Sequence, residues 1–117
     1  KKLLIQFYFG KLKLRREEAN VMTIHVTDEA VDWLIDELDL DEGDTVRFFA
    51  KYGGDSVFQQ GFTIGMTIGE ANKPAVEISK KNIKFQIDEQ DIWFFDDQDL
   101  YVFLENGEVN YSNAPKA

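Results

Sequence analysis

The segment Gly53–Ser56 holds the residues best arranged for chemistry. Two adjacent glycines are followed by a carboxylate at Asp55 and a hydroxyl at Ser56. Glycine takes positive φ values at no steric cost, so this segment can form a tight turn that presents both polar groups. We predict a ligand-binding site on the turn and its flanks, made of Tyr52, Gly53, Gly54, Asp55, Ser56, Gln59 and Gln60. The alternative for Asp55 is a carboxylate that caps its own turn.

A second group of candidates is a run of carboxylates near the C-terminal end. Hard oxygen ligands suit Mg, Mn, Ca or Fe(II), so the run offers an alternative prediction, a carboxylate metal site. The competing interpretation is a solvated rim around the apolar cluster Trp93–Phe95. The carboxylates are Asp88, Glu89, Asp91, Asp96, Asp97 and Asp99.

Groups that do nucleophilic or acid–base catalysis are scarce in this chain. There is no Cys, which excludes disulfides, Cys-ligated zinc and Cys-bound clusters. His25 is the single His, it falls on a predicted strand, and no serine stands in a nucleophile motif. We therefore predict a protein that is not an enzyme and that needs no cofactor.

The charge balance restricts the partners. The 117 residues carry a formal charge of −9, which repels nucleic-acid phosphates and anionic membranes. No apolar run approaches the roughly 20 residues of a membrane span. We predict a protein partner, with basic character, and neither nucleic acid nor membrane. The absence of Cys favours a cytoplasmic location.

The N-terminal part of the domain predicts a strand followed by a capped helix. Thr23 to Val26 alternates as a strand does, Thr27 is a good N-cap, and the helix extends to about Leu38. Its apolar stripe is Ala30, Val31, Leu34, Ile35 and Leu38. An acidic face, formed by Asp28, Asp32 and Asp36, is either solvated or a dock for a basic partner.

The remainder predicts strands. Residues 46–62 form two antiparallel strands around the Asp55–Ser56 tip, interrupted at Gly53-Gly54, and the second continues to Ile68. Gly65 indicates a bulge or a close backbone approach. We expect core packing for Tyr52, Phe58 and Phe62. Further strands are a half-exposed one at Ile83–Ile87 and a hairpin with an Asn106-Gly107 turn, Leu100–Leu104 and Val109–Tyr111.

These elements sum to an α+β domain with one main N-terminal helix and about seven mostly antiparallel strands. Trp93, Phe94 and Phe95 exceed what one strand face can bury, which makes a homodimer through them or through the hairpin an option.

Three segments divide the chain: a basic leader at 1–21, the domain at 22–111 and a tail at 112–117. The leader has six basic and two acidic residues. The codons for Arg15–Glu18 can form a purine-rich run, which would lie before Met22 at the spacing of a bacterial ribosome-binding site from a start codon. We therefore hypothesise translated upstream sequence. A secretion signal or an extra strand at 3–8 are the alternatives.

Three stretches together resemble a HesB-like domain, the fold of the A-type iron–sulfur cluster carriers. They are MTIHVTDEAVDWLIDEL, VRFFAKYGGDSVFQQGFTIG and IKFQIDEQDIWFFDDQDLYVFLENGEV, and the resemblance covers residues 22 to about 111. In the carriers a Cys follows the Gly-Gly and a Cys-Gly-Cys lies near the C-terminus. Here Asp55 occupies the position of the first Cys, and the tail SNAPKA contains no Cys-Gly-Cys. The resemblance implies the fold and a link to iron–sulfur cluster biogenesis, without the carrier activity. We therefore predict a cysteine-less HesB-like binding module.

Overall fold

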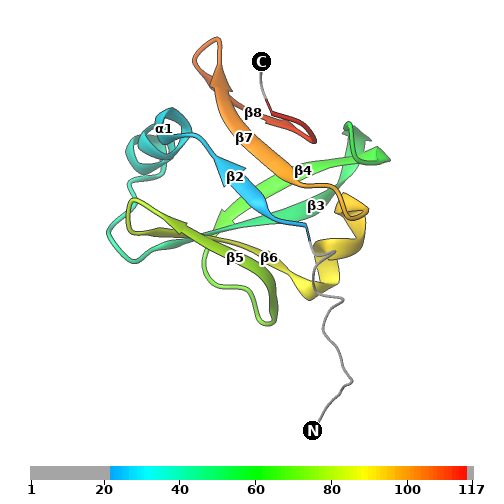
Figure 1. The fold of residues 1–117 in the computed structure, drawn as a ribbon, viewed down its shortest axis with the longest axis horizontal. Helices are drawn as coiled ribbons and strands as arrows, with labels where there is room; N and C mark the ends of the chain where they lie inside the picture. Colours follow the sequence, from blue (N-terminus) through cyan, green and yellow to red (C-terminus); the bar gives the residue numbers. More distant parts are fainter. Residues whose placement is uncertain (1–21, 116–117) are drawn as a thin grey trace, which may run out of the picture.

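The computed structural model describes residues 22–115, and the predictions made for residues 1–21 lie outside this range. Seven strands, one α-helix and one 3₁₀ helix follow one another in this part of the chain (Figure 1), and the predicted α+β class is confirmed. In chain order they are β2 (Ile24–Val26), α1 (Asp28–Leu38), β3 (Thr45–Asp55), β4 (Gln60–Ile68), β5 (Pro74–Lys80), β6 (Ile83–Asp88), η2 (Glu89–Phe95), β7 (Leu100–Glu105) and β8 (Glu108–Ser112).

Helix α1 begins and ends where its sequence dictates. The Thr27 hydroxyl accepts a hydrogen bond from the Ala30 amide at 3.1 Å, which confirms the predicted N-cap. At the other end Asp39 adopts a left-handed conformation, with φ of 55°. The Ile35 carbonyl accepts a hydrogen bond from the Leu40 amide, which closes the last turn.

The strands form two sheets. One has the order β2-β7-β8 and the other β4-β3-β6-β5. Neighbouring strands are antiparallel except for β2 with β7 and β3 with β6, which are parallel. The turn Asn106-Gly107 joins β7 to β8 with positive φ at both residues, as a two-residue hairpin requires.

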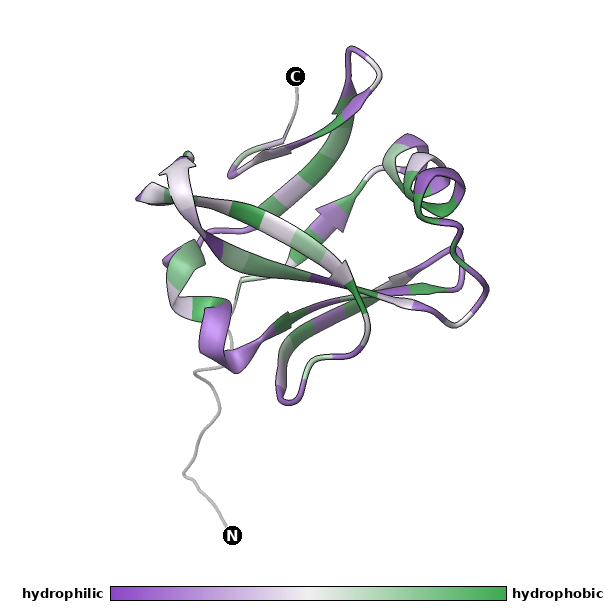
Figure 2. Cartoon of the chain, turned by 180° about the vertical axis from the view of Figure 1, so that it is seen from behind, coloured by the Kyte–Doolittle hydropathy of each residue, from purple (hydrophilic) through white to green (hydrophobic). Residues whose placement is uncertain are grey.

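The core lies between the two sheets and the helix. Figure 2 shows hydrophobic residues along strands of both sheets and on one side of the helix. The Phe48 ring stacks on Phe85 at 6.1 Å in one sheet and meets Tyr111 of the other sheet edge-on at 6.0 Å. Ala30, Val31 and Leu34 of the predicted helix stripe are buried. None of the described helices is long and apolar enough to cross a membrane.

Two packing predictions are wrong. Tyr52 is not part of the core, because 87% of its surface is exposed where β3 extends past the core. Strand β6 is not half-exposed, because Gln86 is buried. Its amide group donates to Glu77 at 2.7 Å and accepts from the Ala71 backbone amide at 2.8 Å, so its polar atoms are satisfied inside the protein.

The glycines explain two features of β3 and β4. Strand β3 runs through Gly53 and Gly54 to Asp55 without ending, with a register shift between Tyr52 and Asp55. Gly65 pairs with Phe49, and the Phe49 ring lies 2.3 Å from where a Cβ at residue 65 would be. The sequence predicts a bulge or a close backbone approach at Gly65, whereas the structure shows regular pairing and an aromatic side chain that covers the glycine.

Candidate functional site at the β3–β4 turn

The polar groups of the β3–β4 turn hold the turn together. One oxygen of Asp55 accepts a hydrogen bond from the Gly61 amide at 2.7 Å. The Ser56 hydroxyl accepts from the amides of Phe58 and Gln59, both at 3.2 Å. These bonds give Asp55 the turn-capping geometry that the sequence offered as the alternative. The second Asp55 oxygen has no hydrogen bond among the described residues, and the residue is exposed.

The two glycines form the bulge that sets the angle of the turn. Gly53 and Gly54 have φ of 112° and 67°, values that other residues rarely adopt. The methyl group of Thr63 lies 3.0 Å from the position of a Cβ at residue 54. A residue with a side chain there would have to adopt a positive φ and would displace the Thr63 methyl group by a few tenths of an ångström, so glycine is favoured at residue 54.

Aromatic rings connect the turn to the core and to the surface. Tyr52 meets Phe62 at 5.7 Å, and Phe62 meets Trp93 of η2 at 5.3 Å, both edge-on. Phe58 of the turn packs against Phe94 and Phe95, which are fully buried. Of the three aromatic residues at 93–95, which were predicted to exceed what one strand face can bury, only Trp93 is exposed, with 51% of its surface accessible.

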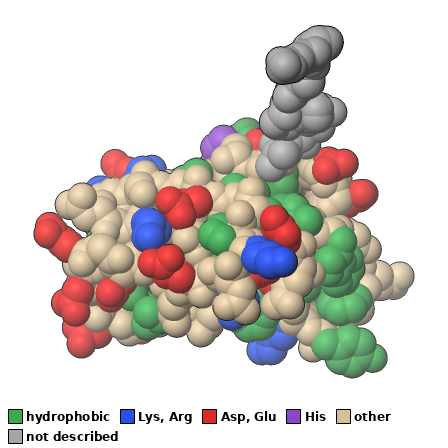
Figure 3. Space-filling model, turned by 90° about the horizontal axis from the view of Figure 1, so that it is seen from below, with side chains coloured by type: hydrophobic (Ala, Val, Ile, Leu, Met, Phe, Trp, Pro, Cys, Tyr) green, Lys and Arg blue, Asp and Glu red, His purple; other side chains and the backbone are tan. Residues whose placement is uncertain are grey.

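Hydrophobic side chains gather at one end of the face shown in Figure 3, the end where Figure 1 places η2 and the β3–β4 turn. Tyr52, Val57 and Trp93 are the exposed large hydrophobic residues of this region, which we call the turn surface. Gln59 joins the turn to η2, because its side-chain amide donates to the Phe94 carbonyl at 3.4 Å. Gln60 is exposed at the start of β4.

A cavity of about 330 Å³ opens beside the turn, between β4 and β8. Burial raises the pKa of Tyr111 to about 12, so its phenol stays protonated at neutral pH. No sequence pattern predicts this cavity, because β8 reaches it only through its pairing with β7. The lining residues are Asp55, Ser56, Val57, Phe58, Thr63, Ile64, Asn110 and Tyr111.

Three of the six carboxylates of the alternative metal site, Asp88, Asp91 and Asp99, have separate partners. Asp88 accepts from the amides of Gln90 and Lys73, and these bonds lower its pKa. Asp91 accepts from the Ala50 amide and lies 3.8 Å from Arg47. Asp99 is hydrogen-bonded to His25 at 2.9 Å, which lowers the pKa of the Asp99 carboxyl. Within residues 22–115 no three acidic or His side chains stand close enough to hold a metal ion.

His25 has a structural setting. Its ring stacks on Tyr101 with centroids 4.3 Å apart, and Asp99 also accepts a hydrogen bond from the Thr23 amide. These contacts tie β2 to the start of β7, as expected for a lone His on a strand.

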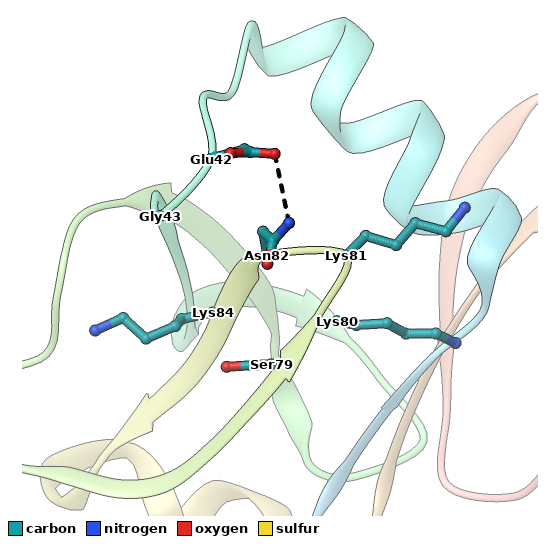
Figure 4. A pocket seen from close by; sticks show the side chains of 7 residues that line it. All are labelled: Glu42, Gly43, Ser79, Lys80, Lys81, Asn82 and Lys84. Atoms are coloured by element: carbon teal, nitrogen blue, oxygen red, sulfur yellow. Dashed lines mark hydrogen bonds between the residues drawn. The ribbon is translucent and has the colours of Figure 1, made fainter.

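A second depression lies at the β5–β6 turn and is lined by lysines (Figure 4). In this view Lys84 extends to one side, and Lys80 and Lys81 both extend to the other side, toward helix α1. Lys80 pairs with Asp28 at 3.0 Å, Lys81 with Asp32 at 2.9 Å and Lys84 with Glu70 at 3.1 Å. Because each positive charge has its own carboxylate, the lysines do not converge on an anion. Two of the three acidic residues on the helix face are thus engaged within the protein.

The comparisons with known proteins give bacterial relatives. The pyruvate dehydrogenase inhibitor of Bacillus subtilis (strain 168) is 41% identical over 81 residues, which cover 69% of this chain and 85% of the relative. An uncharacterized protein of Staphylococcus saprophyticus is 36% identical over 98 residues, or 78% of this chain and 98% of the relative. One from Staphylococcus epidermidis is 37% identical over 86 residues, or 69% and 86%.

No family model and no solved structure matches the chain. The relatives above are similar over most of their own lengths, and the matched part is long enough to include most of the described domain. The chain belongs to the bacterial protein family that includes the Bacillus subtilis pyruvate dehydrogenase inhibitor and these staphylococcal proteins.

Proposed function

We propose that this protein is a non-catalytic regulator that inhibits pyruvate dehydrogenase by binding to it. The observation that carries the proposal is the 41% identity to a relative named as an inhibitor of that enzyme. The geometry agrees with a binding role, because the polar side chains of the predicted site are engaged in holding a turn. A protein that acts by contact needs an accessible surface more than a reactive group.

The turn surface supplies such contacts. Tyr52 and Trp93 are exposed, yet their rings are oriented by Phe62, which lies between them. Aromatic side chains held in this way lose little conformational entropy on binding and are enriched in the residues that dominate interface energies. The excess of negative charge favours a basic surface on the partner.

A HesB-like fold that has lost its cluster ligands is part of the proposal. The resemblance places the first carrier Cys at Asp55 and the other two after Tyr111, so these regions would have to lie together. Asp55 and Tyr111 line one cavity, which supports the resemblance. One carboxylate does not replace three thiolates, so the cavity would remain without a cluster.

The test of function is the rate of pyruvate oxidation by the purified Bacillus subtilis pyruvate dehydrogenase complex. The full chain is added at increasing concentration, and the relative from the same bacterium serves as positive control. We expect saturable inhibition that follows binding measured by biolayer interferometry. Normal turnover in the presence of a folded, saturating amount of the chain would refute the proposal.

The cluster part is tested separately. The chain is incubated anaerobically with ferrous iron and sulfide, desalted, and examined by visible absorption and iron analysis. We expect a colourless protein without bound iron. A stoichiometric cluster would show that the cavity holds one through ligands other than Cys, and this part of the proposal would fall.

A further inference from the structure

Strand β4 has a free edge with unpaired backbone groups. The Gly69 amide donates to the Thr45 carbonyl at 2.9 Å, which makes residues 45 and 69 a hydrogen-bonded pair. In an antiparallel ladder such pairs alternate, so Phe62, Ile64 and Met66 direct their N–H and C=O groups away from β3. Nothing in residues 22–115 pairs with these groups, because β4 is the last strand of its sheet.

The other sheet edges carry features that discourage strand addition, and β4 does not. Strand β5, at the opposite edge, has Pro74, a register shift, and the charged residues Glu77 and Lys80. Strand β2 has three residues, and β8 begins at Glu108. Strand β4 has nine residues with no charge and no proline. Long uncharged edges are rare in proteins unless another strand covers them.

The cavity beside the β3–β4 turn lies along this edge. Its lining includes Thr63 and Ile64 of β4 and Tyr111 of β8. Counting from the two-residue turn Asn106-Gly107, Tyr111 also directs its backbone groups away from β7. An extended segment that enters the cavity therefore meets free backbone groups from two sheets and the apolar side chains of Phe58 and Ile64.

The charge of the cavity indicates what kind of segment fits. Asp55 lines the cavity with one oxygen free of hydrogen bonds among the described residues, and the lining contains no basic side chain. The whole molecule carries −9. The described domain of a second copy would bring the same excess of carboxylates, whereas a basic segment of another protein would be attracted.

We propose that an extended, basic segment of a partner protein adds as a strand to β4, in the cavity between β4 and β8, with a Lys or Arg against Asp55. Backbone pairing along Phe62, Ile64 and Met66 supplies affinity, and alternate side chains enter the cavity. The proposal depends on the proposed function only for which protein supplies the segment, and pyruvate dehydrogenase would be that protein.

The experiment uses a random 12-residue peptide library displayed on phage and selected against the full chain. The tightest peptide is synthesised, and amide hydrogen exchange is followed by NMR. We expect Lys or Arg in the selected peptides and slower exchange at Ile64 and Met66. No enrichment, enrichment of acidic peptides, or protection confined to another region would overturn the proposal.

Two variants with matched controls locate the contact. Met66→Pro removes an outward N–H at an edge where proline is tolerated, and Ser79→Pro does the same on β5. Asp55→Asn keeps an acceptor for the Gly61 amide and removes the charge, and Asp97→Asn removes a charge elsewhere. We expect peptide affinity to fall about tenfold for Met66→Pro and about threefold for Asp55→Asn, with both controls unchanged.

Thermal unfolding shows which variants are folded. If Met66→Pro does not fold, the comparison of Asp55→Asn with Asp97→Asn still tests the proposal. A peptide affinity of Asp55→Asn equal to that of wild type would contradict it. Light scattering tests whether a second copy of this chain occupies the β4 edge instead. If the wild-type protein is a dimer with this edge covered, and if Met66→Pro or Ile64→Lys dissociates the dimer, the second copy is the occupant and the proposal is wrong.

The pyruvate dehydrogenase assay separates the two proposals. Peptide binding at β4 without enzyme inhibition would leave the strand-addition site standing and remove the proposed function. Enzyme inhibition that is unchanged in Met66→Pro and Asp55→Asn would leave the function standing and remove the site.

Discussion

The β3–β4 turn and the β5–β6 turn belong to the same four-stranded sheet, but they differ in whether their surface groups already have partners within the protein. At the β5–β6 turn, Lys80, Lys81 and Lys84 each pair with a carboxylate of another segment. At the β3–β4 turn, Tyr52 and Trp93 remain exposed and the β4 edge has no partner among the described residues. A region whose groups are already paired gains little from a partner, whereas unpaired apolar and backbone groups gain more.

The two regions also differ in how they join the core. The turn surface is continuous with buried rings, because Phe62 contacts Trp93 and Phe94, and Phe94 contacts Phe58. The lysines of the β5–β6 turn form surface ion pairs with the helix and with the loop at Glu70. Substitutions in the first region should therefore cost more stability than those in the second.

The largest effect is expected for Phe94→Ala. The ring is fully buried and contacts Phe58, Phe62 and Phe95, so its loss leaves a cavity where η2 meets the turn. We expect the free energy of unfolding to fall by about 3–5 kcal/mol, measured with urea. The control is Trp93→Ala beside it, which removes a half-exposed ring and should cost clearly less. Equal losses would show that the difference in burial between the two rings does not set the cost.

The next effect is expected for Gly65→Ala. The new Cβ would overlap the Phe49 ring, which would have to leave β4 and its contact with the Arg47 guanidinium, now at 5.5 Å. We expect a loss of about 1–3 kcal/mol in the same urea experiment. The double variant Phe49→Ala with Gly65→Ala tests the cause, because without the ring the alanine should cost much less. An undiminished cost would assign the effect to the backbone of β4.

Sequence reasoning succeeded where the signal is local. The Thr27 cap and the Asn106-Gly107 hairpin depend on residues within one turn of each other, so composition and spacing suffice to predict them. The polar tip of the β3–β4 hairpin was predictable for the same reason.

The failures concern contacts between distant segments. A period of two places Tyr52 on the same face as Phe48 but does not say where the core ends along β3. Gln86 is polar, and its burial depends on Glu77 from β5 and on the loop at Ala71. The cavity between β4 and β8 depends on the order of strands in two sheets.

A pH experiment compares Asp88, whose carboxylate accepts two backbone hydrogen bonds, with Asp97, for which no hydrogen bond or ion pair is seen within residues 22–115. Hydrogen bonds from the Gln90 and Lys73 amides lower the folded-state pKa of Asp88. A lowered folded pKa means that the carboxylate contributes stability above the unfolded pKa of about 3.9, and that this contribution is lost as pH falls through the folded value. We expect wild type to be more stable than Asp88→Asn above about pH 5 and the difference to shrink below about pH 4.

The matched control for this experiment is Asp97→Asn, because Asp97 is exposed and asparagine tolerates its positive φ of 61°. This variant shows how much of the change comes from removing one carboxylate charge alone. Urea unfolding at each pH gives both differences. A difference between wild type and Asp88→Asn that does not change with pH would mean that the amide bonds do not depend on the charge of the carboxylate.

The smallest effect is expected at the lysine-lined turn. The Lys81 ammonium contacts Asp32 at 2.9 Å, and both side chains are largely in water. Exposed ion pairs contribute little to stability, so Lys81→Met should lower the free energy of unfolding less than any of the substitutions above and leave enzyme inhibition unchanged. The pair also raises the pKa of Lys81 through the hydrogen bond to Asp32, so its charge persists at neutral pH. A loss of inhibition in this variant, with stability retained, would reverse the comparison and place the partner at the lysines.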